Sequence, residues 1–282
     1  MLTKLYYKFV GFLLSRRKIK TLAWKFWYPY ITRRLKNSDV TFLNYAFVDE
    51  TTGPSQLELE SGDEKNRACI SLYHHLTQQV DLSGKQILEV SCGHGGGASF
   101  ISRYYHSRHV TAVDLNSEGI RFCKGRHQLS DLDFAVANAE SMPLSENAFD
   151  VVINVEASHA YGDFPAFVKE VFRVLKAGGY FLYADFRSKN ELANWEPELL
   201  RENFQIICSR DITRQVVRGM EQNSERSKNI ARHALPFYLR FLGKMFAGIK
   251  GTRIYRGMKK NDLVYRSYCL QRLRVPNTNN YK

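Results

Sequence analysis

An apolar run that leads directly into a cluster of glycines limits this chain to a few architectures. Residues Ile87 to Val90 are typical of a short buried strand, and Ser91-Cys92-Gly93-His94-Gly95-Gly96-Gly97 follows at once. Glycines at alternating positions allow a tight turn and a close approach to a ligand, because no Cβ stands in the way. A helix can begin near Phe100, and a strand, a glycine turn and a helix form a nucleotide-type cofactor site. Alone, the run is only moderately specific, since Gly93-x-Gly95-x-x-Ala98 also fits a loose dinucleotide fingerprint.

Strand and helix patterns alternate after this turn, which is typical of a parallel sheet covered by helices. Helices are expected between the first five strands, for example over 117–129 and 164–175. Lys176-Ala177-Gly178-Gly179 predicts a turn that stops a helix and starts a strand. The sequence therefore predicts an α/β fold with a doubly wound, mostly parallel sheet of seven strands. The strands are expected near 86–92, 109–115, 132–137, 149–156, 179–186, 204–211 and 263–273.

Composition divides the chain into four parts. Residues 1–62 are expected to form a basic, aromatic helical cap that ends in an acidic loop, and residues 63–212 the cofactor-binding core. Residues 213–262 form a basic insertion between the sixth and seventh strands, with a helical pattern around 233–246. An insertion this long is usually a lid or a substrate-binding element. Residues 263–282 supply the last strand and a polar tail.

The formal net charge of +13 indicates an anionic partner, such as nucleic acid, anionic lipid or an acidic substrate, or else only a basic, solvated surface. Residues 1–36 contain no Asp or Glu and interleave basic with aromatic side chains. An interfacial membrane helix has this composition, with charges for lipid headgroups and rings for the acyl boundary. Alternatively, the aromatic residues 24–30 pack on the main domain. No nucleic-acid-binding motif accompanies the charge, so no nucleic-acid partner is expected.

Cysteine usage and hydropathy indicate the compartment. Five cysteines without a C-x-x-C pair or a histidine at zinc spacing predict reduced thiols, with neither a disulfide framework nor a metal site. No stretch approaches the roughly 20 apolar residues that cross a bilayer, and no cleavage site follows the apolar residues 9–14. We therefore expect a cytoplasmic protein, with peripheral contact to an anionic membrane through residues 1–36.

Three further segments follow the glycine turn at regular distances. Asp114 ends the second strand, about 20 residues after the turn, where a carboxylate accepts hydrogen bonds from ribose hydroxyls. Ala137-Asn138-Ala139-Glu140 follows the third strand, and Asn154-Val155-Glu156-Ala157-Ser158-His159 spans the end of the fourth. This ordered series is a much stronger signal than the glycine turn alone.

The series resembles the class I S-adenosylmethionine-dependent methyltransferases, well over roughly Asp63 to Arg187 and more loosely beyond. A closer similarity is to the mycobacterial phthiotriolone/phenolphthiotriolone dimycocerosate methyltransferases, which O-methylate a hydroxyl on a long polyketide lipid. The N-terminus departs from that family, because here it is longer and much more basic. The similarity rests on Tyr28-Pro29, Asn44-Tyr45-Ala46, Leu72-Tyr73-His74, Glu89 to Ser99, Asn154 to His159, Gly219 with Asn223-Ser224, and Gly248 to Thr252.

The resemblance implies a Rossmann-like core, S-adenosylmethionine as cofactor and O-methylation of a hydroxyl on a lipid- or polyketide-like small molecule. It also implies that Glu89 orders the glycine loop or meets the cofactor amino group, that Asp114 holds the ribose, and that Asn138-Ala139 meets the adenine edge. The full set of expected cofactor residues is Glu89, Gly93, Gly95, Gly97, Asp114, Leu115, Asn138, Ala139 and Asn154.

His159 is the expected general base, because it follows the fourth strand, at the rim where the transferred methyl group should lie. A neutral hydroxyl is a poor nucleophile, and a histidine that titrates near neutrality suits removal of its proton. Similar enzymes that act on sugars and small molecules have a histidine here and an aspartate after the fifth strand, matched by Asp185. Asp185 would orient His159 or share the proton. The alternative is a structural His159, hydrogen-bonded behind the sheet.

Other activities fit parts of the pattern. A C- or O-methyltransferase of a sterol, sugar or glycosylated natural product keeps the same core, and C-methylation would depend on a carboxylate more than on His159. An NAD-dependent oxidoreductase uses the same glycine turn, but Asn138-Ala139-Glu140 and the 154–159 segment do not support it. A nucleic-acid base methyltransferase commonly has Asn/Asp-Pro-Pro-aromatic after the fourth strand, and Asn154-Val155-Glu156-Ala157 differs from it.

Overall fold

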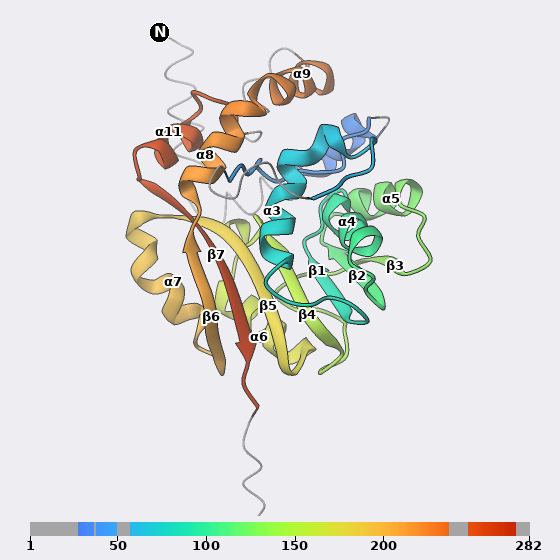
Figure 1. The fold of residues 1–282 in the computed structure, drawn as a ribbon, viewed down its shortest axis with the longest axis vertical. Helices are drawn as coiled ribbons and strands as arrows, with labels where there is room; N and C mark the ends of the chain where they lie inside the picture. The colour runs from blue at the N-terminus through green and yellow to red at the C-terminus, as the bar shows by residue number, and fades with distance from the viewer. Residues whose placement is uncertain (1–27, 37, 50–56, 237–247, 275–282) are drawn as a thin grey trace, which may run out of the picture.

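A seven-stranded sheet runs through the residues that the computed structural model describes, which are 28–36, 38–49, 57–236 and 248–274 (Figure 1). Its strands are β1 (Gln86–Val90), β2 (His109–Asp114), β3 (Leu132–Val136), β4 (Phe149–Val155), β5 (Leu175–Ser188), β6 (Phe204–Asp211) and β7 (Leu263–Arg272). Their order in the sheet is β3-β2-β1-β4-β5-β7-β6. The first five strands pair in parallel, whereas β7 is antiparallel to both β5 and β6. The predicted mostly parallel sheet of seven strands is confirmed.

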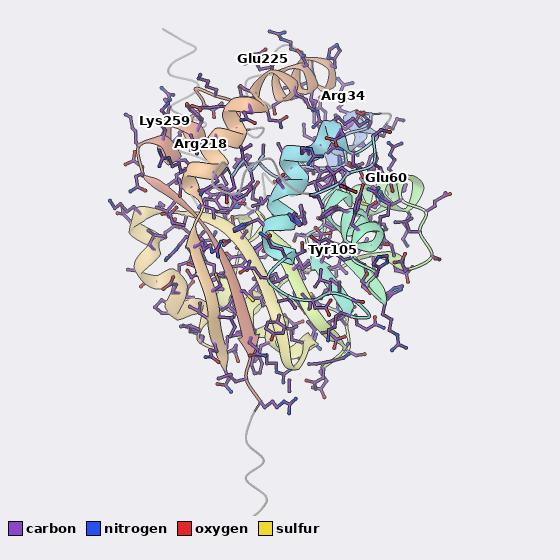
Figure 2. The ribbon with its side chains drawn as sticks, viewed as in Figure 1. Arg34, Glu60, Tyr105, Arg218, Glu225 and Lys259 are labelled. Carbon is purple, nitrogen blue, oxygen red and sulfur yellow. The ribbon has the colours of Figure 1, made fainter. Side chains whose placement is uncertain are left out.

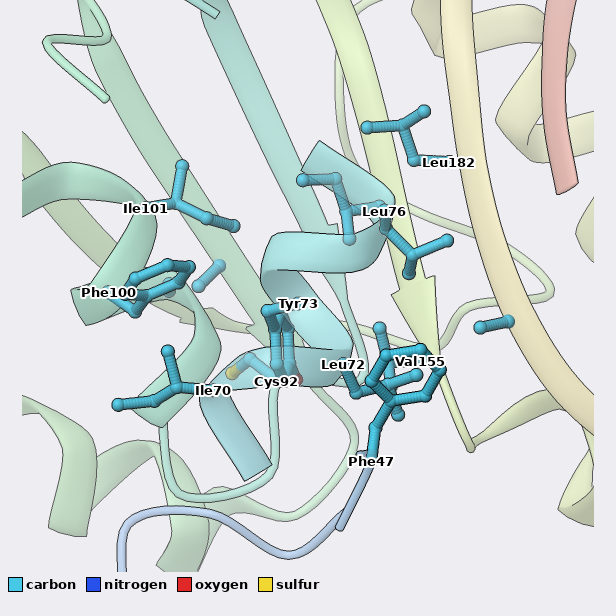
Figure 3. Close-up of a cluster of buried hydrophobic side chains, with 14 of the residues drawn as sticks. Phe47, Ile70, Leu72, Tyr73, Leu76, Cys92, Phe100, Ile101, Val155 and Leu182 are labelled. Atoms are coloured by element: carbon cyan, nitrogen blue, oxygen red, sulfur yellow. The ribbon is translucent and has the colours of Figure 1, made fainter. Parts of the chain in front are cut away.

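Neighbouring residues along the central strands pack into two cores, one on each face of the sheet. Ile87 and Val151 belong to what we call the first core, and Leu88 and Val152 to the second core. Figure 3 shows part of the first core, to which Phe47 and Val155 at the end of β4 both belong. Parallel strands are buried on both faces, which explains the continuous apolar runs from which β1 and β4 were predicted.

Helices cover both faces, as a doubly wound fold requires. Among the helices that bury apolar side chains in the first core are α3 (Arg67–Thr77), α4 (Gly96–Tyr104) and α5 (Ser117–Arg126). Two others bury theirs in the second core: α6 (Phe164–Val174) and α7 (Leu192–Leu199). In α6, the Asp163 side chain caps the first turn by accepting a hydrogen bond from the Ala166 backbone N–H at 3.0 Å.

Two sequence predictions about connections are wrong. Residues 137–148, between β3 and β4, contain no helix, because Asn138 and Ser141 form a bridged turn and Pro143 follows it. The turn expected over 176–179 does not precede β5, since this strand begins at Leu175, directly after α6. Its pairing with β4 shifts register between Phe149 and Val151, so the glycines lie within a strand irregularity.

An extended segment, residues 38–49, which we call the strap, links the N-terminal part of the chain to three distant elements. Residues 28–35 before it are helical. The Thr41 carbonyl accepts a hydrogen bond from the Gly96 amide at 3.1 Å, and the Phe47 amide donates to the Ala68 carbonyl at 2.7 Å. The Val48 amide donates to the Gln215 carbonyl at 3.2 Å. The strap is therefore fixed to the glycine loop, to α3 and to the insertion.

The insertion between β6 and β7 contains α8 (Thr213–Gln222), α9 (Ser224–Ala234) and α11 (Arg253–Lys259). Since β6 runs in the same direction as β5, α8 begins at the carboxyl edge of the parallel strands. It packs directly on the strap, because a Cβ added at Gly219 would lie 2.2 Å from the Ala46 carbonyl oxygen. Within the described parts of the chain, no helix is both long and apolar enough to cross a bilayer.

Several predictions fall outside the described residues. These are residues 1–27 of the membrane-contact segment predicted over 1–36, most of the helical pattern around 233–246, and the polar tail over 275–282.

Candidate active site

A cavity of about 530 Å³ opens at the carboxyl edge of the sheet, where the strand order changes direction between β1 and β4. Doubly wound sheets bind nucleotide-type cofactors at this switch point. The loops after β1, β2, β3 and β4 line the cavity together with the strap, which contributes Thr41, Phe42, Leu43 and Asn44. Of the expected cofactor residues, Gly93, Gly97, Asp114, Leu115, Asn138 and Ala139 line it.

The three expected glycines have different physical roles. Gly93 has a φ of 57° and faces the cavity, where an added Cβ would meet the Leu43 side chain at 3.1 Å. Gly95 has a φ of 76°, and its Cβ would clash with the Phe134 ring at 2.8 Å. At Gly97 an added Cβ would lie 2.1 Å from the Tyr73 ring. The loop therefore needs Gly95 and Gly97 for its own packing, and only Gly93 and Gly97 contact the cavity.

Asp114 ends β2 with both carboxylate oxygens directed to loop amides. Oδ2 accepts a hydrogen bond from the Gly93 amide at 2.9 Å, and Oδ1 accepts one from the Asn116 amide at 2.8 Å. Removal from water raises the pKa of Asp114, and the two amides oppose that effect. Each oxygen keeps a second lone pair, so the carboxylate can also accept hydrogen bonds from a diol in the cavity.

Glu89 lies buried in β1, next to the cavity-lining Tyr73. The Tyr73 hydroxyl donates to Glu89 Oε1 at 2.7 Å, whereas Oε2 has no hydrogen-bond partner among the residues that the structure describes. Burial raises the pKa of Glu89 to about 8. A buried carboxylate with an unsatisfied oxygen suits a cationic donor, which would restore its ionised form.

The remaining expected residues divide into two groups. Asn138 and Ala139 line the cavity in the turn after β3, where Asn138 Oδ1 accepts a hydrogen bond from the Glu140 amide at 3.1 Å. Leu115 is half exposed and offers an apolar surface there. Asn154 is buried outside the cavity lining, because its Nδ2 donates to the Val90 carbonyl at 2.8 Å and to the Tyr161 hydroxyl at 3.0 Å.

His159 and Asp185 meet because β4 and β5 are parallel neighbours and Val155 at the end of β4 pairs with Ala184. Asp185 therefore lies within β5, which continues to Ser188, and not after the fifth strand as expected. His159 lies on the 3-10 helix η2 (Ser158–Ala160), with Nδ1 2.8 Å from Asp185 Oδ1. Its backbone amide donates to Asp185 Oδ2 at 2.8 Å. This geometry puts the proton on Nδ1 and the lone pair of the neutral ring on Nε2. The neighbouring Ala157 and Ala160 line the cavity, whereas His159 itself is not among its lining residues, so its role as the base stays a prediction.

A buried polar network supports this pair. Asp185 Oδ2 accepts a hydrogen bond from the Ser158 hydroxyl at 2.6 Å and lies 3.1 Å from Arg187 Nη1. Arg187 Nη2 donates to the Ser158 hydroxyl at 2.8 Å, and its guanidinium lies over the rings of Phe164 and Trp195. Burial alone would raise the pKa of Asp185, but the His159 ring and the Arg187 guanidinium hold it well below its usual range. Asp185 is therefore an ionised partner for His159.

Glu156 lies immediately after β4, a position from which a carboxylate can line the pocket or simply end the strand. It lines the cavity, and its backbone has a φ of 52°, an uncommon conformation for a residue with a side chain. Its carboxylate accepts hydrogen bonds from the Tyr45 amide of the strap, at 2.9 and 3.0 Å, and from the Tyr265 hydroxyl at 2.8 Å. Glu156 therefore joins the strap to the cavity wall.

Sequence reasoning missed most of the strap side of the cavity. Tyr28, Pro29 and Asn44 enter the sequence analysis only as part of the resemblance. Nothing in the sequence indicates that Phe42 and Leu43 line a cavity, because apolar residues in an extended segment are common in any packed loop. Tyr161 was also missed; its hydroxyl lies 2.6 Å from Ser91 Oγ. Only the long-range contacts of the fold bring these residues together.

The residues present fit S-adenosylmethionine. The Asp114 carboxylate suits a ribose diol, Glu89 Oε2 suits an ammonium group, and the half-exposed Leu115 with the Asn138-Ala139 turn suits the face and edge of a purine. A search for groups of His, Cys, Asp or Glu that could hold a metal ion found none among the described residues.

Comparison with known proteins agrees with this geometry. The family model described as "Methyltransferase domain" matches residues 88–183. The phthiotriol/phenolphthiotriol dimycocerosates methyltransferase of Mycobacterium tuberculosis is 48% identical over 247 residues, which cover 88% of this chain and 91% of that protein. The fatty-acid O-methyltransferase of Mycolicibacterium smegmatis is 41% identical over 252 residues, covering 89% and 90% of the two chains.

Solved structures share the fold at much lower identity. The crystal structure of the [4+2]-cyclase SpnF matches with a TM-score of 0.68 and 18% identity, over 87% of this chain and 94% of that chain. The match supports the Rossmann-like core. Because that structure is of a cyclase, fold alone does not specify the reaction.

Proposed function

The chain belongs to the family of the phthiotriol/phenolphthiotriol dimycocerosates methyltransferases, and from this premise we propose that it O-methylates a hydroxyl group of a lipid- or polyketide-like acceptor with His159 as general base. The protein is an S-adenosylmethionine-dependent methyltransferase. The observation that supports the proposed base is the pairing of His159 with an ionised, buried Asp185 beside the cavity.

S-adenosylmethionine, when bound, supplies an activated methyl group on a sulfonium centre. We propose that Asp114 holds the ribose hydroxyls, that Glu89 Oε2 accepts a hydrogen bond from the amino group, and that Asn138-Ala139 and Leu115 face the adenine. Gly93 and Gly97 leave room for the methionine part. Gly95 and Asn154 act indirectly, since they hold the loop and Tyr161 in place.

His159 accepts the hydroxyl proton at Nε2 in this proposal. The resulting imidazolium keeps its Nδ1–H hydrogen bond to Asp185, whose negative charge stabilises it. General-base catalysis of this kind contributes about 10²- to 10⁴-fold to the rate. Asp185 would itself stay ionised and act by orienting the ring.

A second acceptor class has support from one relative. The fatty-acid O-methyltransferase is 41% identical to this chain, and a fatty acid presents a carboxylate that is already ionised at neutral pH. A carboxylate oxygen needs no base. The dependence of turnover on His159 therefore distinguishes the two classes.

The test compares wild type with His159→Asn on a long-chain secondary alcohol and on a fatty acid, with labelled methyl groups. We expect kcat for the alcohol to fall by about 10²- to 10⁴-fold, while affinity for S-adenosylhomocysteine, measured by calorimetry, stays unchanged. Full turnover of the alcohol by the variant would disprove the base. Turnover of the fatty acid alone would favour the second acceptor class.

We also propose that residues 1–36 bring the enzyme to an anionic membrane surface, where acceptors of this kind lie. Their acid-free, aromatic composition supports this contact. Replacing Arg16, Arg17, Lys18 and Lys20 with glutamine in the full chain should weaken binding to vesicles containing phosphatidylglycerol. Unchanged binding would rule out this contact.

A further inference from the structure

The insertion carries a second basic surface, on α11, on the turn before it and on the residue that follows it. Lys250, Arg253, Arg256 and Lys260, which we call the basic face, are all exposed. None of the four forms an ion pair with a carboxylate in the described parts of the chain. The acids of α8 and α9 are already engaged, since Glu221 lies 3.4 Å from Lys259 and Glu225 pairs with Lys228 at 2.6 Å.

The orientation of this face is fixed by packing. Tyr255 and Met258 on the opposite side of α11 are buried in the first core. A Cβ at Gly257 would meet the Leu263 side chain at 2.9 Å, so the helix lies close against the start of β7. Arg253, Arg256 and Lys260 follow the i, i+3, i+7 spacing of one helical face and must therefore point outward.

The basic face lies at the same end of the molecule as the cavity. Strands β1, β4 and β5 end at the carboxyl edge, and β7, which is antiparallel to β5, begins there, directly after α11. Figure 1 shows α8, α9 and α11 together at this end, and Figure 2 labels Arg218 and Lys259 there. Cations and the cavity that takes the acceptor are thus presented in the same direction.

From this juxtaposition we infer that the basic face docks on an anionic lipid bilayer, so that the carboxyl edge of the sheet faces the membrane. Four cations that form no ion pair with the described carboxylates, on a face whose orientation is fixed by packing, complement a layer of lipid phosphates. Docking by this end places the strap and cavity near the acyl chains from which an apolar acceptor would come. The inference extends the membrane contact proposed for residues 1–36, but it depends on different residues.

The test measures co-sedimentation of the full chain with phosphatidylcholine vesicles, with and without phosphatidylglycerol. The variant replaces Lys250, Arg253, Arg256 and Lys260 with glutamine. A matched control replaces Arg108, Lys124, Arg126 and Arg201, which are exposed at the opposite edge, so the charge change is identical. Thermal melts and calorimetric binding of S-adenosylhomocysteine check that both variants are folded.

We expect wild type to bind only the anionic vesicles, and more weakly at about 0.5 M than at about 0.1 M sodium chloride. Each basic side chain near an anionic surface changes affinity roughly fivefold, so the loss of four should weaken binding by up to about 600-fold. The control should bind like wild type. Turnover of a detergent-dispersed acceptor should be the same in all three proteins, which separates docking from the proposed chemistry.

Three results would overturn the inference. The first is equal binding by wild type and the variant, and the second is an equal loss in the control, which would leave only net charge as the cause. The third is tighter binding to a DNA or RNA duplex of the same charge concentration than to the anionic vesicles. If the variant with glutamine at positions 16, 17, 18 and 20 loses vesicle binding and the basic-face variant keeps it, the membrane contact belongs to the N-terminus alone.

Discussion

The pKa values of the buried carboxyl groups near the cavity are shifted in opposite directions, because the neighbours of these groups differ. Burial raises the pKa of Glu89 and of Glu156 to about 8 each, and among the described residues no cation close to either opposes that effect. Asp185 is equally buried, yet His159 and Arg187 hold its pKa well below the usual range. A buried carboxyl group is thus largely neutral at pH 7 in Glu89 and Glu156, and ionised in Asp185.

Replacement of Arg187 tests how Asp185 is kept ionised. Arg187→Met should lower the free energy of unfolding at pH 7 by about 3–5 kcal/mol, because it leaves a buried charge poorly compensated. The low pKa of Asp185 stabilises the fold above the pKa of the unfolded chain, and this contribution is lost as pH falls. The difference between wild type and variant should therefore shrink towards pH 3 in urea titrations.

Arg187→Lys is the matched control for charge. Lysine keeps the positive charge but not the planar fork that reaches both Asp185 and Ser158. We expect it to recover part of the stability and little of kcat, since His159 is oriented through this network. Equal stability of Arg187→Met and wild type at pH 7 would contradict the argument.

Glu89 predicts a pH dependence of cofactor affinity. Without ligand it is largely protonated at pH 7, and a cationic amino group beside it should drive ionisation, so S-adenosylhomocysteine should bind with release of a proton. Affinity should rise between pH 6 and 7.5, on the acidic side of the Glu89 pKa of about 8. Glu89→Gln should remove the proton release and bind roughly 10- to 100-fold more weakly.

Calorimetry in buffers of different ionisation enthalpy measures this proton. The exposed Glu146→Gln serves as control and should behave like wild type. Binding by wild type without proton release at pH 7 would mean that Glu89 only orders the loop.

At the scale of elements, the features that depend on local sequence patterns could be predicted from the sequence. The glycine run and Asp114 placed the cofactor end of the site, because strand, turn and acid follow one another within one segment. The strap could not be predicted, since Phe42 and Leu43 acquire their role only through contacts with residues far along the chain. The helix expected between β3 and β4 was wrong because a general alternation was extended to a segment that contains Pro143.

Gly219 in α8 offers a test of how the insertion packs on the strap. Gly219→Ala should destabilise the protein by about 1–3 kcal/mol, because its Cβ would lie 2.2 Å from the backbone oxygen of Ala46. Gly125 in α5 is the matched control, since nothing lies within 4 Å of an added Cβ there. Gly125→Ala should be neutral or stabilise by up to about 1 kcal/mol through helix propensity. Thermal melts of both variants decide the point, and an unchanged melting temperature for Gly219→Ala would contradict the packing.

At the scale of the whole molecule, the cavity is lined by the strap together with segments that lie far from it in the sequence. Binding of S-adenosylhomocysteine at 100 times its Kd should slow amide exchange by about 100-fold for openings that expose the cavity. We expect this protection at Tyr45 and in the glycine loop, but not in α7, which packs on the second core away from the cavity. Hydrogen exchange with mass spectrometry measures it. Protection confined to the glycine loop would show that the strap opens independently of the cofactor.

The long-range contacts of the strap also form in a fixed order as the chain is synthesised. The Tyr45 amide reaches Glu156 across 111 residues, and the Val48 amide reaches Gln215. A nascent chain from which Gln215 has not yet emerged can form β1 to β5 and the strap contacts to Ala68, Gly96 and Glu156, but it lacks the contact between the strap and the insertion. Such contacts between distant residues form late and slow folding. The side of the strap that α8 covers therefore stays exposed until the insertion emerges, and this is the interval in which a chaperone would have to protect it.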